Sequence, residues 1–264
     1  MIRLAVAGAT GRMGSRIIEL AGADQRFDLV AALEATGHPK VGKTIDIQAQ
    51  SKTIKIPIQD HTETEFDILI DFSLPAGTMH WLEYCLHYKR AMVIGTTGHT
   101  PDQIDEIEKA AKNIPLLKAS NMSVGVNLMF KLAGQIAAIL GDDYNIEIVE
   151  THHRFKKDAP SGTALTLRDS IIKTTGRNME KDVIYGRHGQ IPERPARQIG
   201  IHALRVGDTV GEHEVHFGNL GETVILKHNA HTRDTFVNGA LRAAAWLAGK
   251  PAGRYDMLDV LEMT

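Results

Sequence analysis

Residues 151–165, THHRFKKDAPSGTAL, gather basic side chains immediately before a predicted helix start. The order Pro160-Ser161-Gly162-Thr163 is typical of a helix N-terminus, because a Ser or Thr oxygen caps free backbone N–H groups and glycine leaves them uncovered. Such an end carries partial positive charge and binds phosphates or carboxylates. The basic side chains are His152, His153, Arg154, Lys156 and Lys157. The segment therefore predicts a site that holds a small polyanion and delivers a proton to it.

A second motif is the glycine loop GATGRMG, which follows the apolar run IRLAVAG and precedes a predicted helix, SRIIELAG. Its G-x-x-G-x-x-G spacing differs by one position from the most common dinucleotide-binding pattern. Glu34 ends the second predicted strand, where a carboxylate accepts hydrogen bonds from ribose hydroxyls. The loop residues predicted to contact a nucleotide are Gly8, Gly11, Arg12, Met13 and Gly14. The alternative is a glycine turn that only lets the helix pack on the strand, with Glu34 solvated.

Two further loops, GTTG and ASNMS, follow apolar runs at positions where open parallel sheets bind ligands. Their small residues let a flat ring and its ribose approach the backbone, although ordinary turns would have the same composition. The candidate cofactor-binding residues in these loops are Gly95, Thr96, Thr97, Ala119, Ser120, Asn121 and Met122.

The elements that must position these loops fall into two regions. In the first 120 residues, apolar runs without polar alternation predict a parallel sheet between helices: IRLAVAG, DLVAALE, DILIDFS, AMVIGTTG and PLLKASN. Later runs predict longer strands of a mixed sheet: NIEIVETHH, QIGIHALRVGD, GEHEVHFG and ETVILKHNA. One helix follows Pro160, and a polar loop surrounds IPERPAR. The run RDTFVNGALRAAAWLAG predicts a helix that ends at Gly249 and packs on the first domain.

Composition restricts the partners of the chain. A length of 264 residues, 43% hydrophobic content and a net charge of -2 are typical of a globular protein with one or two cores. The near-neutral charge argues against a nucleic-acid partner. The longest apolar region, SVGVNLMFKLAGQIAAIL, is broken by Asn127, Lys131 and Gln135, so we expect an amphipathic helix and no membrane span. The N-terminus enters MIRLAVAG without a leader, so we expect a cytoplasmic protein.

Cysteine and histidine chemistry looks limited. The single cysteine, Cys85, lies in a predicted helix without a close basic partner, so we expect a buried, inert thiol. The histidine pairs at 213/216 and 228/231 fall on predicted strands, where side chains three residues apart point to opposite faces. We therefore expect no metal site.

The segment ETHHRFKKDAPSGTA resembles the signature of the 4-hydroxy-tetrahydrodipicolinate reductases, also called dihydrodipicolinate reductases. The similarity continues in order over nearly the whole chain, through GATGRMG, DFS at 71–73, GTTG, ASNMSVGVN, RVGDTVGEHEV and HNAHTRDTFVNGALRAAAWL. The resemblance implies an enzyme of diaminopimelate and lysine biosynthesis that reduces a cyclic dicarboxylate with NADH or NADPH and forms a homotetramer.

With the resemblance, the expected fold class is α/β. It comprises a Rossmann-like dinucleotide-binding domain over 1–122, completed by the C-terminal helix at about 232–264. An α+β domain with a mixed sheet over 123–231 would bind the substrate and form the oligomer.

The resemblance also implies roles for single residues. His152 and Lys156 would be the catalytic acid/base pair, with the direct proton donor left open between them. The residues expected to bind the substrate carboxylates are His153, Ser161, Gly162 and Thr163. Phe72 of the DFS motif joins the cofactor-binding set. Family members that favour NADPH often have a basic residue after the acidic one; Ala35 follows Glu34 here, so we expect both cofactors to be used.

Two other function classes stay open. A catalytically silent nucleotide sensor is one, because Rossmann folds host many functions; such a protein would be expected to lack His152, Lys156 or the helix start at Ser161, and all are present. The other is a different nicotinamide oxidoreductase with the same two-domain plan, such as a sugar or aldehyde dehydrogenase. A catalytic cysteine would favour the aldehyde enzyme, and Cys85 has no supporting setting.

Overall fold

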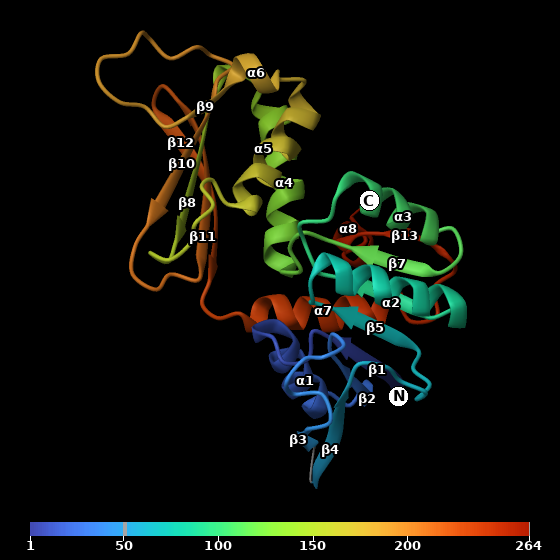
Figure 1. The fold of residues 1–264 in the computed structure, drawn as a ribbon. Coiled ribbons are helices and arrows are strands. Elements are labelled where there is room, and N and C mark those ends of the chain that lie inside the picture. The colour runs from blue at the N-terminus through green and yellow to red at the C-terminus, as the bar shows by residue number, and fades with distance from the viewer. Residues whose placement is uncertain (50–51, 264) are drawn as a thin grey trace. The chain divides into compact units, whose positions relative to one another are not determined.

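The computed structural model describes residues 1–49 and 52–263. The chain forms two compact units, one made of Met1–Val124 with Asp234–Thr264 and the other of Gly125–Arg233. Each unit is built on its own sheet, and most strands of both sheets are labelled in Figure 1.

The sheet of the first unit has the order β13-β7-β6-β5-β1-β2-β4-β3. Its strands are β1 (Ile2–Ala7), β2 (Phe27–Leu33), β3 (Thr44–Ala49), β4 (Lys52–Gln59), β5 (Ile68–Asp71), β6 (Ala91–Ile94), β7 (Pro115–Lys118) and β13 (Gly253–Tyr255). All neighbouring strands run parallel except β3 and β4, which form an antiparallel pair. The core order β4-β2-β1-β5-β6-β7 is that of the Rossmann fold. The predicted parallel sheet is confirmed, while the β3–β4 hairpin and β13 were not predicted.

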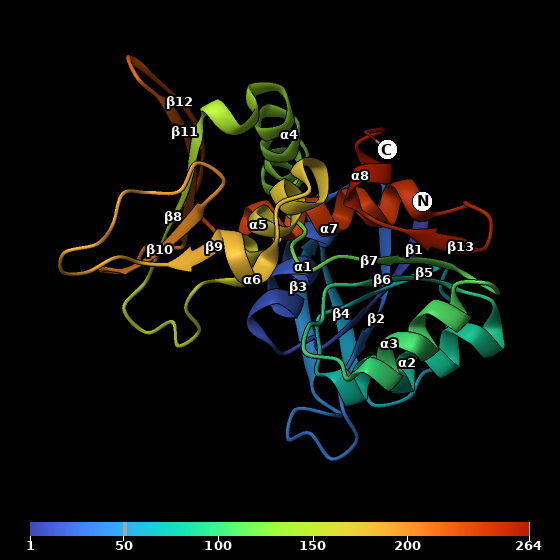
Figure 2. The same ribbon diagram turned by 90° about the horizontal axis from the view of Figure 1, so that it is seen from above.

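Helices cover both faces of this sheet. Two of them, α1 (Arg12–Ala23) and α7 (Asp234–Leu247), share a core cluster with Leu4 and Val6 of β1. On the other face, α2 (Pro75–Tyr88) and α3 (Pro101–Ala110) cover Ala5 and Ala7, and Figure 2 shows both helices on one side of the strands. The short α8 (Met257–Val260) completes the unit. Burial on both faces explains why the strands lack polar alternation.

Two predictions about this unit are confirmed. Cys85 of α2 is fully buried, and burial raises the pKa of its thiol. The C-terminal helix α7 packs in the core of the first unit through Val237, Ala240 and Leu241. It ends at Leu247, two residues before the predicted end at Gly249, whose positive φ of 82° is incompatible with a continuing helix.

The second unit has a mixed sheet of order β12-β11-β8-β10-β9, as predicted. Its strands are β8 (Asn145–His152), β9 (Val183–Tyr185), β10 (Ile199–Arg205), β11 (Gly211–Asn219) and β12 (Glu222–Ala230). The β8–β10–β9 part is parallel and the β8–β11–β12 part is antiparallel. Helices α4 (Val124–Leu140) and α5 (Gly162–Thr175) lie beside the sheet in Figure 1 and share one core cluster with it. The four long strands were predicted, and β9 was missed.

Helix α4 was predicted to be amphipathic. The stretch Val124–Asp143 has the length and composition of a membrane span, and its mean hydropathy is 1.5. Within the second unit, however, Val126, Met129 and Phe130 of this helix are buried in the core against β8 and α5. One face of the helix is therefore apolar because it packs in the core of the second unit.

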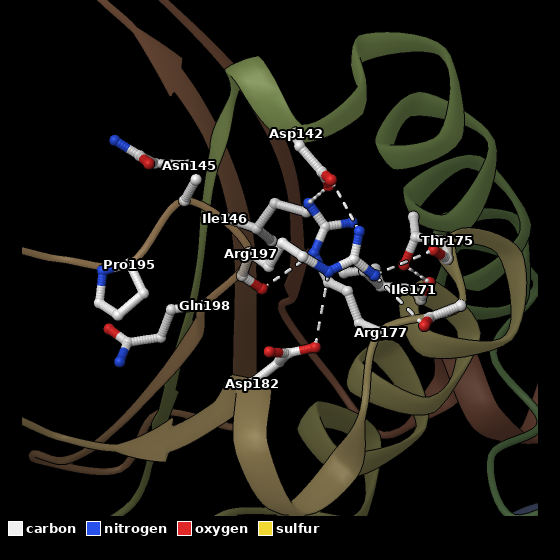
Figure 3. A network of polar contacts seen from close by, with 12 residues as sticks. Asp142, Asn145, Ile146, Ile171, Thr175, Arg177, Asp182, Pro195, Arg197 and Gln198 are labelled. Atoms are coloured by element: carbon white, nitrogen blue, oxygen red, sulfur yellow. Dashed lines mark hydrogen bonds and ion pairs between the residues drawn. The ribbon is translucent and has the colours of Figure 1, made fainter.

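Ion pairs bind the polar loop between β9 and β10 to the rest of the second unit, as Figure 3 shows. Asp142 of the 3₁₀ helix η1 (Gly141–Asp143) pairs with Arg177 at 3.1 Å and with Arg197 at 2.7 Å. Arg177 also donates through Nε to the Arg197 carbonyl oxygen at 3.0 Å. Asp182, in α6 (Met179–Asp182), lies 3.8 Å from Arg197 Nε. The Arg177 side chain is fully buried, and burial lowers its pKa, so Asp142 supplies a necessary counter-charge.

Candidate functional site

The glycine loop of the first unit turns sharply into α1. Helix α1 begins at Arg12, three residues earlier than predicted, so Met13 and Gly14 lie in its first turn. A Cβ atom at Gly14 would lie 2.0 Å from the Gly8 carbonyl oxygen, and one at Gly8 would lie 2.4 Å from the Phe72 carbonyl oxygen. Only glycine fits at these two positions, and the close packing brings the DFS loop against the glycine loop.

A pocket of about 500 Å³ opens beside this loop. It is lined by Gly8, Thr10, Gly11, Glu34, Ala35, Thr36, His38, Asp60, Phe72, Ser73, Leu74, Ala76, Gly77, His80 and Trp81. Four residues of the predicted cofactor set, Gly8, Gly11, Glu34 and Phe72, are among them. The remaining predicted residues do not line it. Several polar lining residues, including Thr10 and Asp60, were not predicted.

Strand β2 ends at Leu33, one residue earlier than predicted, so Glu34 lies directly after it and points to the glycine loop. Its Oε1 accepts hydrogen bonds from the Thr10 backbone N–H and the Thr10 hydroxyl, each at 2.7 Å. His38 Nε2 lies 3.4 Å from the same hydroxyl. A carboxylate, a hydroxyl and an imidazole therefore meet at one wall of the pocket, which suits a polar ligand such as a sugar.

Asp71, at the end of β5, joins two of the predicted loops. Its fully buried carboxylate accepts hydrogen bonds from the hydroxyls of Ser73 at 2.5 Å, Thr78 at 2.5 Å and Thr96 at 2.9 Å. Burial raises the pKa of Asp71, and the hydroxyl donors oppose that rise. A Cβ atom at Gly95 would lie 2.2 Å from the tip of the Phe72 ring. The DFS and GTTG motifs thus form one packed cluster.

The third predicted loop packs against α7. A Cβ atom at Gly239 would lie 1.7 Å from the Met122 carbonyl oxygen, so the loop and the helix backbone are in close contact. Met122 is buried, and the Asn121 side chain accepts a hydrogen bond from the Ser123 N–H at 2.8 Å. The loop therefore has a defined conformation at the end of β7.

In the second unit, the predicted helix start is confirmed. Helix α5 begins at Gly162, and the hydroxyl of the N-cap Ser161 accepts a hydrogen bond from the Ala164 N–H at 3.2 Å. Upstream, His152 ends β8 and is 9% exposed. Lys156 is half-buried and pairs with Asp158 at 2.8 Å. His153 Nδ1 is buried and has no hydrogen-bond partner in the part of the chain that the structure describes.

A buried carboxylate connects these elements. Glu150 Oε2 lies 2.5 Å from His152 Nδ1, and Glu150 Oε1 accepts the Ser161 N–H at 2.9 Å. Arg205 of β10 donates to both oxygens, each at 2.9 Å. Burial would raise the pKa of Glu150, but these hydrogen bonds outweigh it and lower the pKa to about 2.

A second histidine, His213, lies beside this network. Its Nε2 is 3.1 Å from the Ser161 hydroxyl, and its ring centroid is 5.2 Å from that of His152 in an edge-to-face arrangement. Burial and then the charge of His152 lower the pKa of His213 to about 3. The ring is therefore neutral at physiological pH.

The predicted separation of the histidine pair on β11 is confirmed. His213 is buried on one face of the strand, and His216 contacts Glu214 on the opposite face. The prediction for the second pair needs correction. His228 lies on β12, but His231 lies one residue beyond the strand end at Ala230. Within residues 1–49 and 52–263, no group of three or more His, Cys, Asp or Glu side chains could hold a metal ion.

Comparison with known proteins decides the family. Residues 2–122 match the N-terminal domain of dihydrodipicolinate reductase, and residues 125–261 match its C-terminal domain. The chain belongs to the dihydrodipicolinate reductase family. Two relatives named 4-hydroxy-tetrahydrodipicolinate reductase, from Desulfotalea psychrophila and Syntrophus aciditrophicus, are 44% and 46% identical to it. Each alignment covers 99% of this chain and 98% of the relative.

Solved structures agree with the family. The dipicolinate-bound dihydrodipicolinate reductase from Paenisporosarcina sp. TG-14 superposes with a TM-score of 0.75 and 26% identity, covering 98% of each chain. An amine dehydrogenase from Mycobacterium smegmatis gives a TM-score of 0.62 at 12% identity and covers 96% of this chain and 94% of its own, so it shares the fold alone.

Three residues of the second-unit network were missed by sequence reasoning: Glu150, Arg205 and His213. A signal for the first was present, because Glu150 and His152 are two residues apart on a predicted strand and must share a face. Arg205 and His213 reach the network only through strand pairing.

Proposed function

We propose that this protein reduces 4-hydroxy-tetrahydrodipicolinate to tetrahydrodipicolinate with NADH or NADPH, in diaminopimelate and lysine biosynthesis. The observation that carries the proposal is the family match over both halves of the chain, which includes the segment from His152 to Thr163. The buried Cys85 speaks against an aldehyde dehydrogenase that uses a thiol nucleophile.

The first unit would bind the dinucleotide. The pocket beside the glycine loop would hold the adenosine, with Glu34 accepting from ribose hydroxyls and Arg12 near the phosphates. The GTTG and ASNMS loops would hold the nicotinamide end of the cofactor. Once bound, the reduced nicotinamide supplies the hydride. The chain would orient that ring through the DFS and GTTG motifs, which Asp71 joins by hydrogen bonds to Ser73 and Thr96.

The second unit would bind the dicarboxylate. The start of α5 offers partial positive charge to one carboxylate, with Ser161, Gly162 and Thr163 in contact. His153 Nδ1, which has no partner among the described residues, is available as a further donor. His152 and Lys156 form the acid/base pair that protonates the reduced substrate. The Lys156 ammonium, released from Asp158, would also attract the dianion.

We further propose a cytoplasmic homotetramer that has neither a nucleic-acid nor a membrane partner. The edge strand β12 exposes apolar side chains, with Val224 at 42% and Ile225 at 52% exposure, which another subunit would cover. Light scattering at micromolar concentration should show four subunits. A fully active, stable monomer would contradict this assembly.

The decisive test is a coupled assay with the upstream condensation product, in which nicotinamide absorbance reports turnover. We expect substrate-dependent oxidation of both NADH and NADPH. A protein that binds the nucleotide but never oxidises it in the presence of substrate would be the silent sensor instead.

A further inference from the structure

Glu150 is placed where it can control the orientation of His152. It lies on β8, is fully buried, and has both oxygens occupied: Oε2 by His152 Nδ1 and Arg205, and Oε1 by the Ser161 N–H and Arg205. The two Arg205 N–H groups and the Ser161 backbone N–H can only donate hydrogen bonds. The carboxylate is therefore ionised, and it requires a proton on His152 Nδ1.

The opposite side of the imidazole is shaped by a glycine. A Cβ atom at Gly211 of β11 would lie 3.1 Å from His152 Nε2, which is tighter than an ordinary contact. His213 packs its ring against His152 edge-to-face. Nε2 has no hydrogen-bond partner in the described part of the chain, so it is the nitrogen left for a ligand.

We propose that Glu150 is a positioning residue that holds the Nδ1 proton of His152, so that Nε2 faces the substrate as the nitrogen that binds and releases the transferred proton, and that it also fixes the start of α5. This inference rests on the proposed reductase function. After hydride addition, the Nε2–H bond of the imidazolium breaks and the proton bonds to the substrate's electron pair. The ring is left neutral with its remaining proton on Nδ1, still held by Glu150. One carboxylate thus links the proton donor to the anion-binding helix end.

The variant Glu150→Gln tests this arrangement, because the amide can be placed in only two ways. With its NH₂ group at the Oε1 position, that group meets the Ser161 N–H and one Arg205 N–H, which are both donors. With its NH₂ group at the Oε2 position, that group meets one obligatory donor, the second Arg205 N–H. It can donate to His152 Nδ1 there if Nδ1 has lost its proton. The second placement is favoured, so E150Q should move the His152 proton to Nε2.

Two readouts separate positioning from simple stabilisation. Nitrogen–proton NMR of histidine-labelled protein, with His152→Gln for assignment, should show the Nδ1–H form in the wild-type protein and the Nε2–H form in E150Q. Steady-state kinetics are measured below the melting temperature of the less stable of the two proteins, wild type or E150Q. They should show that kcat falls at least tenfold in E150Q while the KM for NADH stays within twofold.

Glu147→Gln is the matched control. Glu147 lies on the same strand but on the other face, and it also binds arginines and a histidine: Arg187 at 2.8 Å, Arg194 at 2.9 Å and His202 at 2.7 Å. E147Q should leave kcat and the His152 signal unchanged. An equal loss of kcat in both variants, or an unchanged kcat in E150Q, would overturn the proposal.

A wild-type His152 that is protonated only at Nε2 would overturn it as well, even if E150Q did not fold. Since the NMR readout needs no turnover, it tests the positioning role separately from the reductase assay.

Discussion

Glu34 and Thr10 are joined by two hydrogen bonds of 2.7 Å, one from the backbone N–H and one from the hydroxyl of Thr10, both to the same carboxylate oxygen. The pair closes the glycine loop onto the end of β2. The same carboxylate is the group proposed to accept the ribose hydroxyls of the cofactor, so loop geometry and cofactor recognition depend on one side chain.

Glu34→Ala should therefore weaken NADH more than NADPH. Losing a hydrogen bond to a charged group costs about 1.5–3 kcal/mol, so the KM for NADH should rise roughly tenfold or more. Steady-state kinetics with each cofactor checks this, and Glu63→Ala, at an exposed glutamate of the same unit, is the control. The wild-type protein should use both cofactors, and a hundredfold preference for NADPH would contradict that expectation.

Thr163→Val and Lys156→Met should differ in kind. The valine keeps the shape but deletes a hydroxyl donor, so the KM for the dicarboxylate should rise while cofactor affinity is unchanged. The methionine removes the ammonium, so kcat should fall by roughly a hundredfold or more. Lys157→Met, at the exposed neighbouring lysine, is the control. Near wild-type turnover of Lys156→Met would leave His152 as the only proton donor in the segment.

Gly95→Ala should disturb the cofactor site from within the protein. The added methyl would lie 2.2 Å from the Phe72 ring, which must move. Overpacking of this kind costs about 1–3 kcal/mol, and Phe72 lines the pocket. We expect a lower melting temperature and a higher KM for NADH; unchanged values of both would show that the ring moves freely.

Acid should destabilise the second unit through two carboxylates. The pKa values of Glu147 and Glu150 are lowered from 4.5 to about 2 in the folded protein. Because the folded-state pKa is depressed, the stabilisation is complete above pH 4.5 and is lost as the pH falls toward 2. Each group contributes up to about 3 kcal/mol. Urea unfolding at several pH values should show a decline that E147Q and E150Q each reduce.

Asp142→Asn should destabilise more than Arg177→Met. The asparagine leaves the fully buried Arg177 guanidinium without its carboxylate. Because the Asp142 side chain is itself 49% exposed, we expect a cost of about 1–3 kcal/mol, below that of a fully buried pair. The methionine removes the buried charge and keeps an apolar stem, which is often much less costly. Chemical denaturation of both variants measures the difference, and the reverse order would contradict the role of Asp142.

Local signals predicted the elements that depend on neighbouring residues. The buried strands β1, β2, β5, β6 and β7 followed from their continuous apolar runs, and the start of α5 followed from its Ser161 cap. The β3–β4 hairpin was missed although its isoleucines alternate with polar residues, because the strands predicted in this part of the chain were continuous apolar runs. The three-residue β13 is defined by its pairing with β7.

The site was harder to predict because its geometry depends on pairing between distant segments. Arg205 reaches Glu150 from 55 residues away because β10 runs beside β8, with Arg205 directly opposite His152. The spacing of residues in the sequence does not predict how β10 pairs with β8. The sequence pointed to His152 and Lys156 as chemical groups, but not to the carboxylate that holds one of them.

The burial of Cys85 makes the chain a convenient scaffold for chemical labelling. Its only thiol lies on α2, is buried in the core of the first unit and has a raised pKa. Maleimides and iodoacetamide should therefore leave the folded protein unmodified. A cysteine introduced at Leu220, which is 99% exposed, would then be the sole reactive thiol. A fluorophore attached there would report on subunit association without first removing the native cysteine.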